Sequence, residues 1–575
     1  MKDESTPTRR ETDTSIGSSA DVESAGRHSG LTPELVFALR AGYRRDDFAA
    51  DLLAGLTVAA LALPLSLAIA IGSGADPAKG VISSIVGGVL VSALGGTRFQ
   101  IGGPAAAFIV VIGGIVAKQG YEGLMLASIM AGFILIGAAL LQLGTFAKYV
   151  PGPVILGFTS GLGVVIAAGQ LKDFFGLSGA IPTEFIDRMV ALWAARGSAN
   201  SSALLIGLIA TGLVLAIKSW RPRWPGLLIA IVATSALAWA LGLPVATVGS
   251  QFGAMPASLP LPAVPLVSVA RIVELMPTAL TMAFLIGMES LLSATAADAL
   301  AGTRHRPNTE ILAQGLANIA AALFSGLPVT GVIARTGANI QAGARTPLAG
   351  VIHAATILFL VLVLAPLVAY LALPCLAAVL LTVSWRLMDV HEIRRFLATA
   401  PRDDAIVCAL TLGLTIFFGL NVALGVGVGL AAALFMHRMA ELPGHHIVPH
   451  DPEKLIAGMR QLIFRGPMFF GQSSRITDAL RDARQDTRVL LLDLGEVPLI
   501  DATAIDALDD VVAECRTRGC TIIIAGLQDQ PRLAFERSGF LRRNDVTVAQ
   551  DAHAAVVLAR TLLAPITPDA GPSTR

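Results

Sequence analysis

The chain has 575 residues, of which 54% are hydrophobic and only 14% are charged, and its mean hydropathy is +0.70. A soluble protein contains about a quarter charged residues, so the composition excludes an ordinary soluble protein and indicates an integral membrane protein. The net charge of +1 gives no sign of a nucleic-acid partner.

The first 45 residues are polar, and we expect them to form a partly disordered cytoplasmic tail. Apolar segments then follow one another to about residue 440. We expect helices near residues 51–72, 79–95, 105–118, 122–145, 151–171, 202–218, 225–242, 275–300, 309–325, 332–343, 347–371, 373–384, 403–420 and 422–437. A full crossing needs about 20 apolar residues, so the third and tenth segments are half-helices. This pattern predicts an all-α polytopic domain of 14 segments, in two inverted halves of seven.

The two half-helices are preceded by similar breaks. Residues 95–105 and residues 325–336 each run from an extended, Gly/Pro-rich stretch into a short apolar segment. In lipid, such backbone persists only where protein or a water-filled cavity satisfies its N–H and C=O groups. A matched pair of interrupted segments is the best sequence pointer to a secondary transporter's binding site. Two helix N-termini facing each other carry partial positive charge, so the expected ligand is an anion.

The half-helices are expected to begin at Gly103-Pro104 and near Gly331, where small residues let an oxyanion approach the backbone. The alternative is that these glycines only permit tight helix packing. The residues expected to form the anion site are Gln100, Gly103, Pro104, Ala105, Ala106, Gly331, Val332, Ala334, Arg335, Thr336 and Ser66.

Three polar side chains of this region each have two interpretations. The Gln100 amide either donates to the anion or holds the extended strand in place. Arg335 either raises the local positive potential or forms a structural ion pair. Glu289 lies in an apolar helix and is either the ion-coupling residue or the partner of Arg335 in a static salt bridge. Desolvation favours the neutral form of a carboxyl group, so Glu289 is a candidate proton carrier.

The composition changes after His437, where strands and amphipathic helices alternate. Residues 488–494 predict a buried strand, residues 504–518 a helix, and residues 521–526 the next strand. This alternation predicts a small α/β domain with a mainly parallel sheet.

Several motifs are characteristic of one family: residues 51–58 leading to Pro64, 96–105, 287–293, 318–328 and 343–347, and in the tail Asp493, Pro498, 500–501 and 536–539. On these motifs the chain resembles the SulP anion permeases, the sulfate-permease group whose animal members include prestin and pendrin. The tail is similar to a STAS domain. The resemblance implies a UraA-like arrangement of core and gate domains in the membrane, elevator-like motion and a homodimer. It implies domains at 46–440 (transmembrane anion transporter) and 447–563 (cytoplasmic STAS), with a disordered tail at 564–575.

The resemblance also bears on single residues. Family members place an arginine beside the anion pocket, as Arg335 would be here, but often have serine where this chain has Ala334. In related bicarbonate carriers an acidic residue on the helix of Glu289 helps to hold sodium, so Na⁺ near Glu289 is an alternative to H⁺. STAS antagonists carry a phosphorylatable residue next to the position of Asp501; here Ala502 follows, and Thr503 is expected to be a helix N-cap.

Basic residues fall in alternate loops, and the positive-inside rule then places both termini in the cytoplasm, with the protein in the inner (cytoplasmic) membrane. The sequence predicts a proton-coupled secondary transporter of sulfate, a C4-dicarboxylate or bicarbonate, without a cofactor. A sodium-coupled bicarbonate symporter, an uncoupled anion channel or exchanger and an anion-sensing signalling protein are the alternatives. The absence of a GxxxxGK[ST] loop argues against an ATP-driven pump, and no enzyme motif appears.

Overall fold

The computed structural model describes residues 31–145, 151–179, 181–182, 184–221, 224–253, 258–265, 267–441, 448–449, 458–469, 487–543 and 546–563. The chain divides into two compact units, Met1–Val428 and Gly429–Arg575. The tails expected at 1–30 and 564–575 lie outside the described residues. Within the remainder of the expected N-terminal tail, Glu34–Arg40 forms the short helix α2.

The first unit is helical, as expected. Its main helices are α3 (Arg45–Gly72), α4 (Pro77–Leu94), α5 (Ile109–Leu140), α6 (Gly152–Phe175), α8 (Ser201–Trp220), α9 (Gly226–Ala240), α11 (Val269–Ala301), α12 (Pro307–Leu323), α13 (Ile333–Gln341), α14 (Leu348–Val368), α15 (Leu373–Met388), α17 (Arg402–Phe417) and α18 (Leu420–Glu441). Among the described residues, nine helical spans are long and apolar enough to cross a membrane.

The helix α5 contains two of the expected segments. Gly120 interrupts it with φ 67° and ψ −176°, close to the boundary expected between the third and fourth segments. A glycine accepts this backbone conformation because it has no Cβ. With α5 counted as two segments, the helices correspond to the fourteen expected from the sequence.

Three short helices were not expected. The structure adds α7 (Phe185–Ala194) and α10 (Val248–Phe252) in connections between helices, and α16 (Val390–Thr399) directly after α15. The sequence analysis gave no helix between residues 171 and 202, between 242 and 275, or between 384 and 403. Both α7 and α16 are only ten residues long, which is too short for the length criterion that identifies a membrane span.

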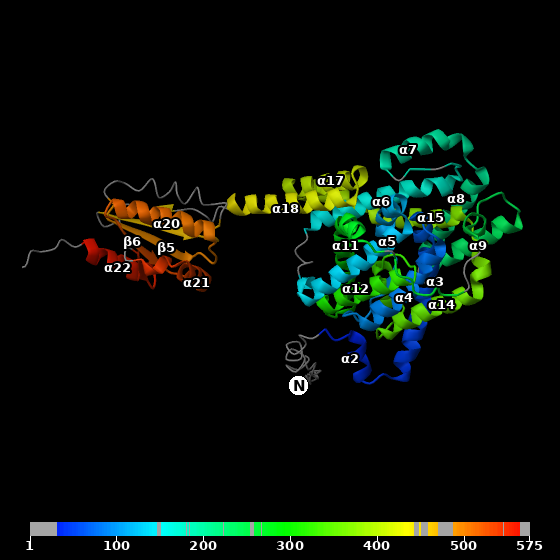
Figure 1. The fold of residues 1–575 in the computed structure, drawn as a ribbon, viewed down its shortest axis with the longest axis horizontal. Coiled ribbons are helices and arrows are strands. Elements are labelled where there is room, and N and C mark those ends of the chain that lie inside the picture. Colours follow the sequence, from blue (N-terminus) through cyan, green and yellow to red (C-terminus); the bar gives the residue numbers. More distant parts are fainter. Residues whose placement is uncertain are drawn as a thin grey trace, which may run out of the picture. The chain divides into compact units, whose positions relative to one another are not determined.

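The membrane helices pack in two groups (Figure 1). The core cluster contains α3, α4, α5, α11, α12, α13 and α14, with α5 packed on α12 and α14 packed on α3 and α4. The gate cluster contains α6, α8, α9, α15 and α17, in which α6 packs against both α15 and α17. Both interrupted segments, which the sequence analysis expects to form the anion site, belong to the core cluster.

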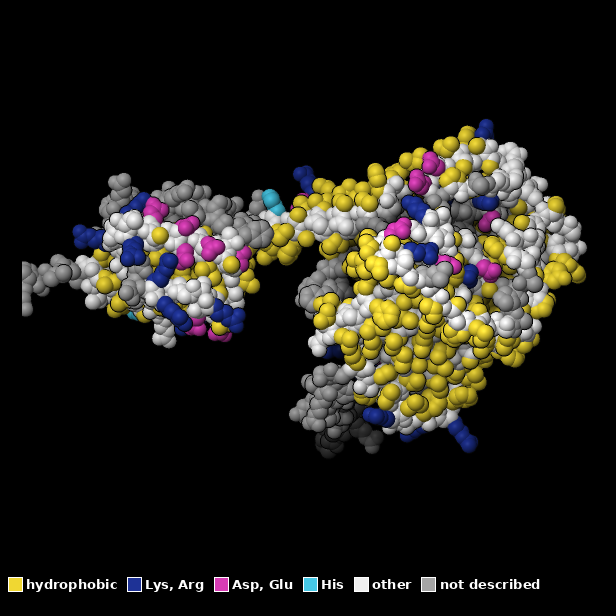
Figure 2. All heavy atoms as spheres, in the orientation of Figure 1, with side chains coloured by type: hydrophobic (Ala, Val, Ile, Leu, Met, Phe, Trp, Pro, Cys, Tyr) yellow, Lys and Arg dark blue, Asp and Glu magenta, His cyan; other side chains and the backbone are white. Residues whose placement is uncertain are grey.

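The outer surface of the membrane unit is apolar over a wide area. Figure 2 shows hydrophobic side chains covering most of the visible face of this unit, with charged side chains sparse on it. Large side chains such as Phe133, Leu208 and Phe359 are more than half exposed. A continuous apolar exterior of this kind suits contact with lipid rather than with water.

The second unit contains one five-stranded sheet in the order β3-β4-β5-β6-β7. Its strands are β3 (Val448–Pro449), β4 (Met459–Arg465), β5 (Val489–Glu496), β6 (Thr521–Ala525) and β7 (Val546–Ala549), and its helices are α20 (Ala502–Thr517), α21 (Asp529–Ser538) and α22 (Ala552–Leu563). Only the β3–β4 pair is antiparallel. Leu490 and Leu492 face one core and Leu491 faces another, so both sides of β5 are buried, as in a sheet covered by helices. The mainly parallel sheet confirms the sequence prediction.

Candidate functional site

The two interrupted segments meet in a short antiparallel ladder. The strand β1 (Gly102–Gly103) pairs with β2 (Thr330–Gly331), with Gly102 opposite Gly331 and Gly103 opposite Thr330. A further backbone bond joins Val332 N–H to the Ile101 carbonyl at 3.0 Å. The ladder satisfies extended backbone that lipid could not satisfy. It brings together residues that are more than 220 positions apart in the sequence, as expected for a shared site.

A helix begins just beyond each strand. After β1, a single 3₁₀ turn, η2 (Ala106–Phe108), leads into α5, and the Phe108 N–H bonds to the Ala105 carbonyl at 3.1 Å. After β2, α13 begins at Ile333, and the Thr336 N–H bonds to the Val332 carbonyl at 2.9 Å. The N–H groups that precede these first bonds have no acceptor within their helix and carry the positive end of the helix dipole.

The first residues of both half-helices are open on one side. Ala106 is half-buried, and Ile333 and Ala334 are exposed, whereas Pro104 and Val332 are buried. Pro104 precedes the helix and has no N–H that would need an acceptor. Two N-terminal turns, each with residues that are at least partly exposed, therefore flank the ladder, an arrangement that suits oxyanion binding at helix ends.

Arg335 is the charged residue of this region and is fully buried. Its Nη1 donates to Ser84 Oγ at 3.0 Å, and its Nη2 donates to Ser66 Oγ at 3.0 Å and to the Pro104 carbonyl at 3.5 Å. The last contact links the second half-helix directly to the start of the first. Ser66 is itself paired with Ser84, with 2.6 Å between their hydroxyl oxygens.

The Arg335 guanidinium has no acidic partner within the described part of the chain. Its hydrogen bonds with described residues all go to neutral oxygens, and its Nε has no hydrogen-bond partner there. The static salt bridge to Glu289 that the sequence left open is therefore not formed. Glu289 is half-buried and makes no hydrogen bond or ion pair with a described residue. A buried cation that lacks a fixed counter-charge is costly and favours the binding of an anion beside it.

Two of the three glycines of the ladder, Gly103 and Gly331, leave no room for a side chain beside a polar group. A Cβ on Gly103 would overlap Arg335 Nη1, and a Cβ on Gly331 would overlap the Gln100 amide. Close approach between backbone and polar side chains thus requires glycine at both positions. The sequence analysis also considered that these glycines permit tight packing. They do so here, because the missing side chains leave room for Arg335 and Gln100.

Gln100 and Thr336 brace the ladder. The Gln100 amide donates to Ser290 Oγ at 2.7 Å and to the Ser290 carbonyl at 3.2 Å, which matches the strand-holding interpretation of this residue. Thr336 Oγ1 accepts from the Ile101 N–H at 3.2 Å and from Ser293 Oγ at 3.3 Å. Both side chains are almost fully buried. They fix the geometry of the half-helices, whereas Ala334 lies at their exposed side.

Glu289 lies on the side of α11 that faces the ladder. Residues three and four positions apart share a helix face. Ile286, three residues before Glu289, accepts a hydrogen bond from Thr330 Oγ1 at 3.3 Å, and Ser293, four residues after it, donates to Thr336. The Glu289 carboxyl group is thus placed between two contacts that α11 makes with the second break. No cluster of three or more His, Cys, Asp or Glu side chains occurs in the described residues.

The sequence analysis missed Glu310, a fully buried carboxylate on α12. Its Oε2 accepts from the Gly96 N–H at 3.0 Å and from Thr97 Oγ1 at 2.8 Å, and its Oε1 accepts from Gln314 Nε2 at 3.0 Å. Ser290 Oγ, which holds Gln100, lies 3.5 Å from the same Oε1. Glu310 therefore supports the extended segment that leads into β1.

Asn318 supports the second break in the same way. It donates to the Val329 carbonyl at 2.7 Å and accepts from the Val329 N–H at 2.8 Å. Glu310, Gln314 and Asn318 recur every fourth residue along α12. This spacing places the three polar side chains on one face of an apolar helix. The pattern could have revealed them from the sequence, because buried polar side chains need hydrogen-bond partners.

In the second unit, the structure corrects the expected helix cap. The N-cap of α20 is Asp501, whose Oδ1 accepts from the Ala504 N–H at 2.8 Å. Thr503 lies inside the first turn and is exposed. The sequence analysis chose Thr503 because it considered only hydroxyl groups, but a carboxylate at the N-terminus also satisfies a free N–H and complements the helix dipole.

This fold, with two opposed half-helices around a paired break and a buried arginine, defines a multi-pass membrane transporter. A model described as the sulfate permease family matches residues 48–411, and a STAS domain model matches residues 455–555. The chain belongs to the sulfate permease family of anion transporters, and is not an enzyme. This confirms the resemblance identified from the sequence.

Similar proteins support this assignment. The chain is 34% identical over 509 residues to YvdB of Bacillus subtilis (strain 168), named as a candidate sulfate transporter, with 87% of this chain and 96% of YvdB covered. It is 29% identical over 521 residues to the bicarbonate transporter BicA of Picosynechococcus sp., with 86% of this chain and 91% of BicA covered.

Two solved structures share the fold. The murine SLC26A9 anion transporter in the inward-facing state superposes with a TM-score of 0.82 at 19% identity, covering 96% of each chain. The transmembrane domain of a cyanobacterial BicA superposes with a TM-score of 0.60 at 27% identity, covering 67% of this chain and 98% of that domain. The first likeness shows the architecture alone.

Proposed function

We propose that this protein is a secondary active transporter that carries a small anion across the cytoplasmic membrane in symport with protons. The observation that carries the proposal is the buried Arg335 guanidinium, which contacts Ser66, Ser84 and Pro104 but no described carboxylate. An anion held between the two half-helix N-termini would supply the missing negative charge. Both the backbone donors and the guanidinium would then stabilise the bound anion.

The chemistry of this site defines a class of substrates. Backbone N–H groups and a guanidinium recognise oxyanions without a fixed side-chain shape, so sulfate, bicarbonate and C4-dicarboxylates such as fumarate all suit it. Arg335 is already engaged with Ser66, Ser84 and Pro104, and the Val332 N–H is bonded to the Ile101 carbonyl, so most direct contacts are assigned to the N–H groups of Ala105, Ala106 and Ala334 and their neighbours. Gln100 and Thr336 act by holding the ladder.

Glu289 is proposed as the ion-coupling residue. It has no cationic partner among the described residues and lies on the α11 face that contacts the second break. Intramembrane carboxyl groups usually mark proton or ion paths. Protonation of Glu289 removes a negative charge close to the incoming anion, which lets anion and proton occupy the core cluster together.

Sodium-coupled bicarbonate transport is the second candidate. The 29% identity to BicA, a protein named as a bicarbonate transporter, favours it. In that case Glu289 would contribute a carboxylate oxygen to a Na⁺ ion, a ligand type that hard cations prefer. Coupling to Na⁺ and coupling to H⁺ predict different results for Glu289→Gln. The glutamine side chain keeps one oxygen that can bind Na⁺, but it cannot take up and release a proton.

Transport is proposed to proceed by elevator-like movement of the core cluster relative to the gate cluster. The half-helices, Arg335 and Glu289 all belong to the core cluster, so the site can move as one body. We further propose a homodimer, with both termini and the STAS domain in the cytoplasm. An uncoupled channel would instead pass anions without dependence on a second gradient.

The experiment is uptake into proteoliposomes of labelled sulfate, bicarbonate and fumarate, each under a proton gradient alone and a sodium gradient alone. We expect accumulation of one anion that requires the proton gradient, and we expect Glu289→Gln to abolish that requirement. Glu274→Gln, at an exposed position on the same helix, is the control and should behave as the wild type. Gradient-independent flux would refute coupling, and unchanged pH dependence in Glu289→Gln would remove Glu289 from this role.

A further inference from the structure

A second feature of the membrane unit lies at the joint between α15 and α16. The helix α15 ends at Met388, Asp389 adopts a left-handed conformation with φ 32°, and α16 begins at the next residue. Asp389 also caps α16, since its Oδ1 accepts from the Glu392 N–H at 3.2 Å. The single left-handed residue interrupts the apolar stretch Leu373–Thr399 and separates α15 from α16.

The ten residues of α16 are amphipathic. Val390, Ile393 and Leu397 recur at helical spacing on one side, and His391, Arg394 and Arg395 occupy another. None of the α16 side chains is fully buried, and Val390 and Leu397 are each 43% exposed. A short helix with an exposed apolar face and arginines beside it has the properties of an interfacial helix that lies in the plane of a membrane surface.

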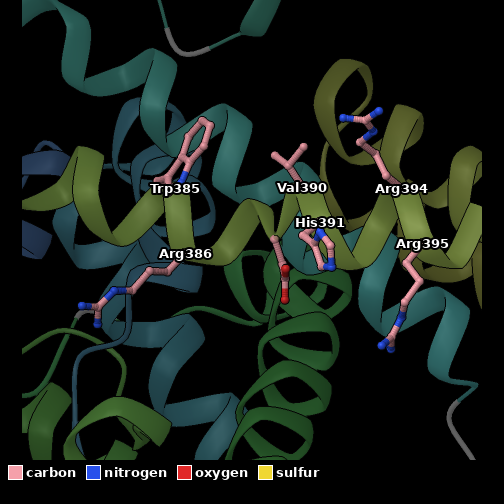
Figure 3. Close-up of a pocket in the computed structure, with 7 residues that line it drawn as sticks. Trp385, Arg386, Val390, His391, Arg394 and Arg395 are labelled. Carbon is pink, nitrogen blue, oxygen red and sulfur yellow. The ribbon is translucent and has the colours of Figure 1, made fainter. Parts of the chain in front are cut away.

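The joint is also hollowed. A cavity of about 890 Å³ is lined by Trp385, Arg386, Asp389, Val390, His391, Arg394 and Arg395. Figure 3 shows that these side chains come from the end of α15 and the first two turns of α16, with Arg386 at one end of the row and Arg394 and Arg395 at the other. In this view Arg386, His391 and Arg395 point to one side, and Trp385 and Arg394 to the other.

The charges of this hollow are not balanced by the residues that the structure describes. Arg395 pairs with Glu392 of its own helix at 2.6 Å. Arg386 and Arg394 have no ion pair with any described residue. Asp389 is the one acidic residue in the lining, against three arginines. An exposed cluster of this sign attracts an anion, and arginine in particular matches the oxygen geometry of a phosphate group.

We propose that this hollow binds the headgroup of an anionic phospholipid, which we call the α15–α16 lipid site. Arg386, His391 and Arg395, which point to one side of the row, supply the positive charge for the phosphate, and the exposed apolar residues Val390 and Leu397 contact the lipid beside it. Trp385, 67% exposed at the end of α15, takes the headgroup-level position that tryptophan favours. Basic residues next to a membrane span are typical of anionic-lipid recognition. A free anion would use the arginines but would gain nothing from this apolar surface.

The site differs in place and chemistry from the proposed anion-transport site. The helix α16 packs against α6 and α17, which belong to the gate cluster. The ladder and the half-helices belong to the core cluster. A lipid bound there would hold the gate cluster to the membrane surface. The inference does not depend on which anion the protein carries or on how transport is coupled.

The test is a titration of the purified full-length protein in detergent with dihexanoyl-phosphatidylglycerol, followed by calorimetry. Dihexanoyl-phosphatidylcholine tests the need for negative charge, and inorganic phosphate tests the need for lipid. The variant R386Q/R394Q/R395Q removes the three arginines of the site. The control K218Q/R221Q/R304Q removes three exposed positive charges from other connections between helices, so both variants lose the same net charge.

We expect phosphatidylglycerol to bind at least tenfold more tightly than phosphatidylcholine or phosphate. The site variant should lose at least tenfold in this affinity, and the control less than twofold. Equal losses in both variants, or equal binding of the two lipids, would overturn the proposal. Phosphate binding as tight as phosphatidylglycerol would show a free-anion site and would also overturn it. If the triple variant does not remain folded, R386E against R304E provides the same comparison with one substitution each.

Discussion

Arg335 lies directly against Gly103, so that a single methyl group on the glycine would occupy the position of the guanidinium Nη1. This contact joins the two interrupted segments at the point where their helices begin. It also explains why a full positive charge can be buried there, since the guanidinium reaches Ser66, Ser84 and the Pro104 carbonyl across the space that Gly103 leaves open. The relationship can be tested by substitution at either residue.

Gly103→Ala should displace Arg335 and the start of the first half-helix. Overpacking of a well-packed site costs about 1–3 kcal/mol, which corresponds to a fall of roughly tenfold or more in transport rate. The measurement is the initial rate of anion uptake into proteoliposomes at equal protein content. Gly114→Ala is the control, because a Cβ at Gly114 meets no atom within 4 Å. Wild-type uptake by Gly103→Ala would contradict the steric argument.

Arg335→Ala should weaken anion binding while leaving the fold intact. Hydrogen bonds to charged groups contribute about 1.5–3 kcal/mol, so the half-saturating anion concentration should rise by about ten- to a hundredfold. Arg335→Lys should recover only part of the affinity, because an ammonium group cannot reach Ser66 and Ser84 with the same planar geometry. Arg345→Ala, at an exposed arginine paired with Asp47, serves as the control. Unchanged affinity in Arg335→Ala would assign the residue a structural role.

Glu310→Ala should destabilise the core cluster. The substitution removes the acceptor for the Gly96 N–H and Thr97 hydroxyl and leaves these buried donors unpaired, at a cost of about 1–3 kcal/mol each. We expect a clearly lower midpoint of thermal unfolding in detergent. Glu122→Ala removes an exposed ion pair with Arg271 and should change stability by less than about 1 kcal/mol. Equal midpoints for the two variants would show that the Glu310 bonds contribute little.

Asp501→Ala should loosen the first turn of α20 in the STAS unit. Loss of an N-cap side chain costs about 1 kcal/mol, so amide hydrogen exchange at Ala504 and its neighbours should speed up by roughly fivefold. The full-length protein can be used, with exchange read by mass spectrometry of peptides that cover residues 501–510. Thr503→Ala should have little effect, because Asp501 provides the cap. The reverse order of effects would restore Thr503 as the cap.

Much of the architecture was predictable because it is encoded locally. The length and apolarity of each segment identify the membrane helices, and the short segments after Gly103 and Gly331 identify the half-helices without any tertiary information. The parallel sheet of the second unit was predictable for the same reason, since a buried strand, an amphipathic helix and another buried strand follow one another. By contrast, α7 and α16 escaped prediction because ten residues are too few for these length criteria.

The partners of the polar residues were not predictable. Gln100 had two equal interpretations until Ser290, 190 positions away, proved to lie beside its amide. Glu289 was either the ion-coupling residue or the partner of Arg335, since both are charged residues in apolar segments. The structure gives Arg335 two serines instead and leaves Glu289 without a partner among the described residues. Opposite charge alone does not determine which buried groups meet.

The sequence by itself determined that this protein spans a membrane, that two of its helices are interrupted in matching places, and that a small α/β domain follows. Such features depend on hydrophobicity, chain length and backbone breaks, which act over a few residues. Only the tertiary structure decided that Gly102 lies opposite Gly331, and that Glu310 and Asn318 hold the two breaks. Those contacts join residues from separate helices or segments, and they depend on packing that no local pattern encodes.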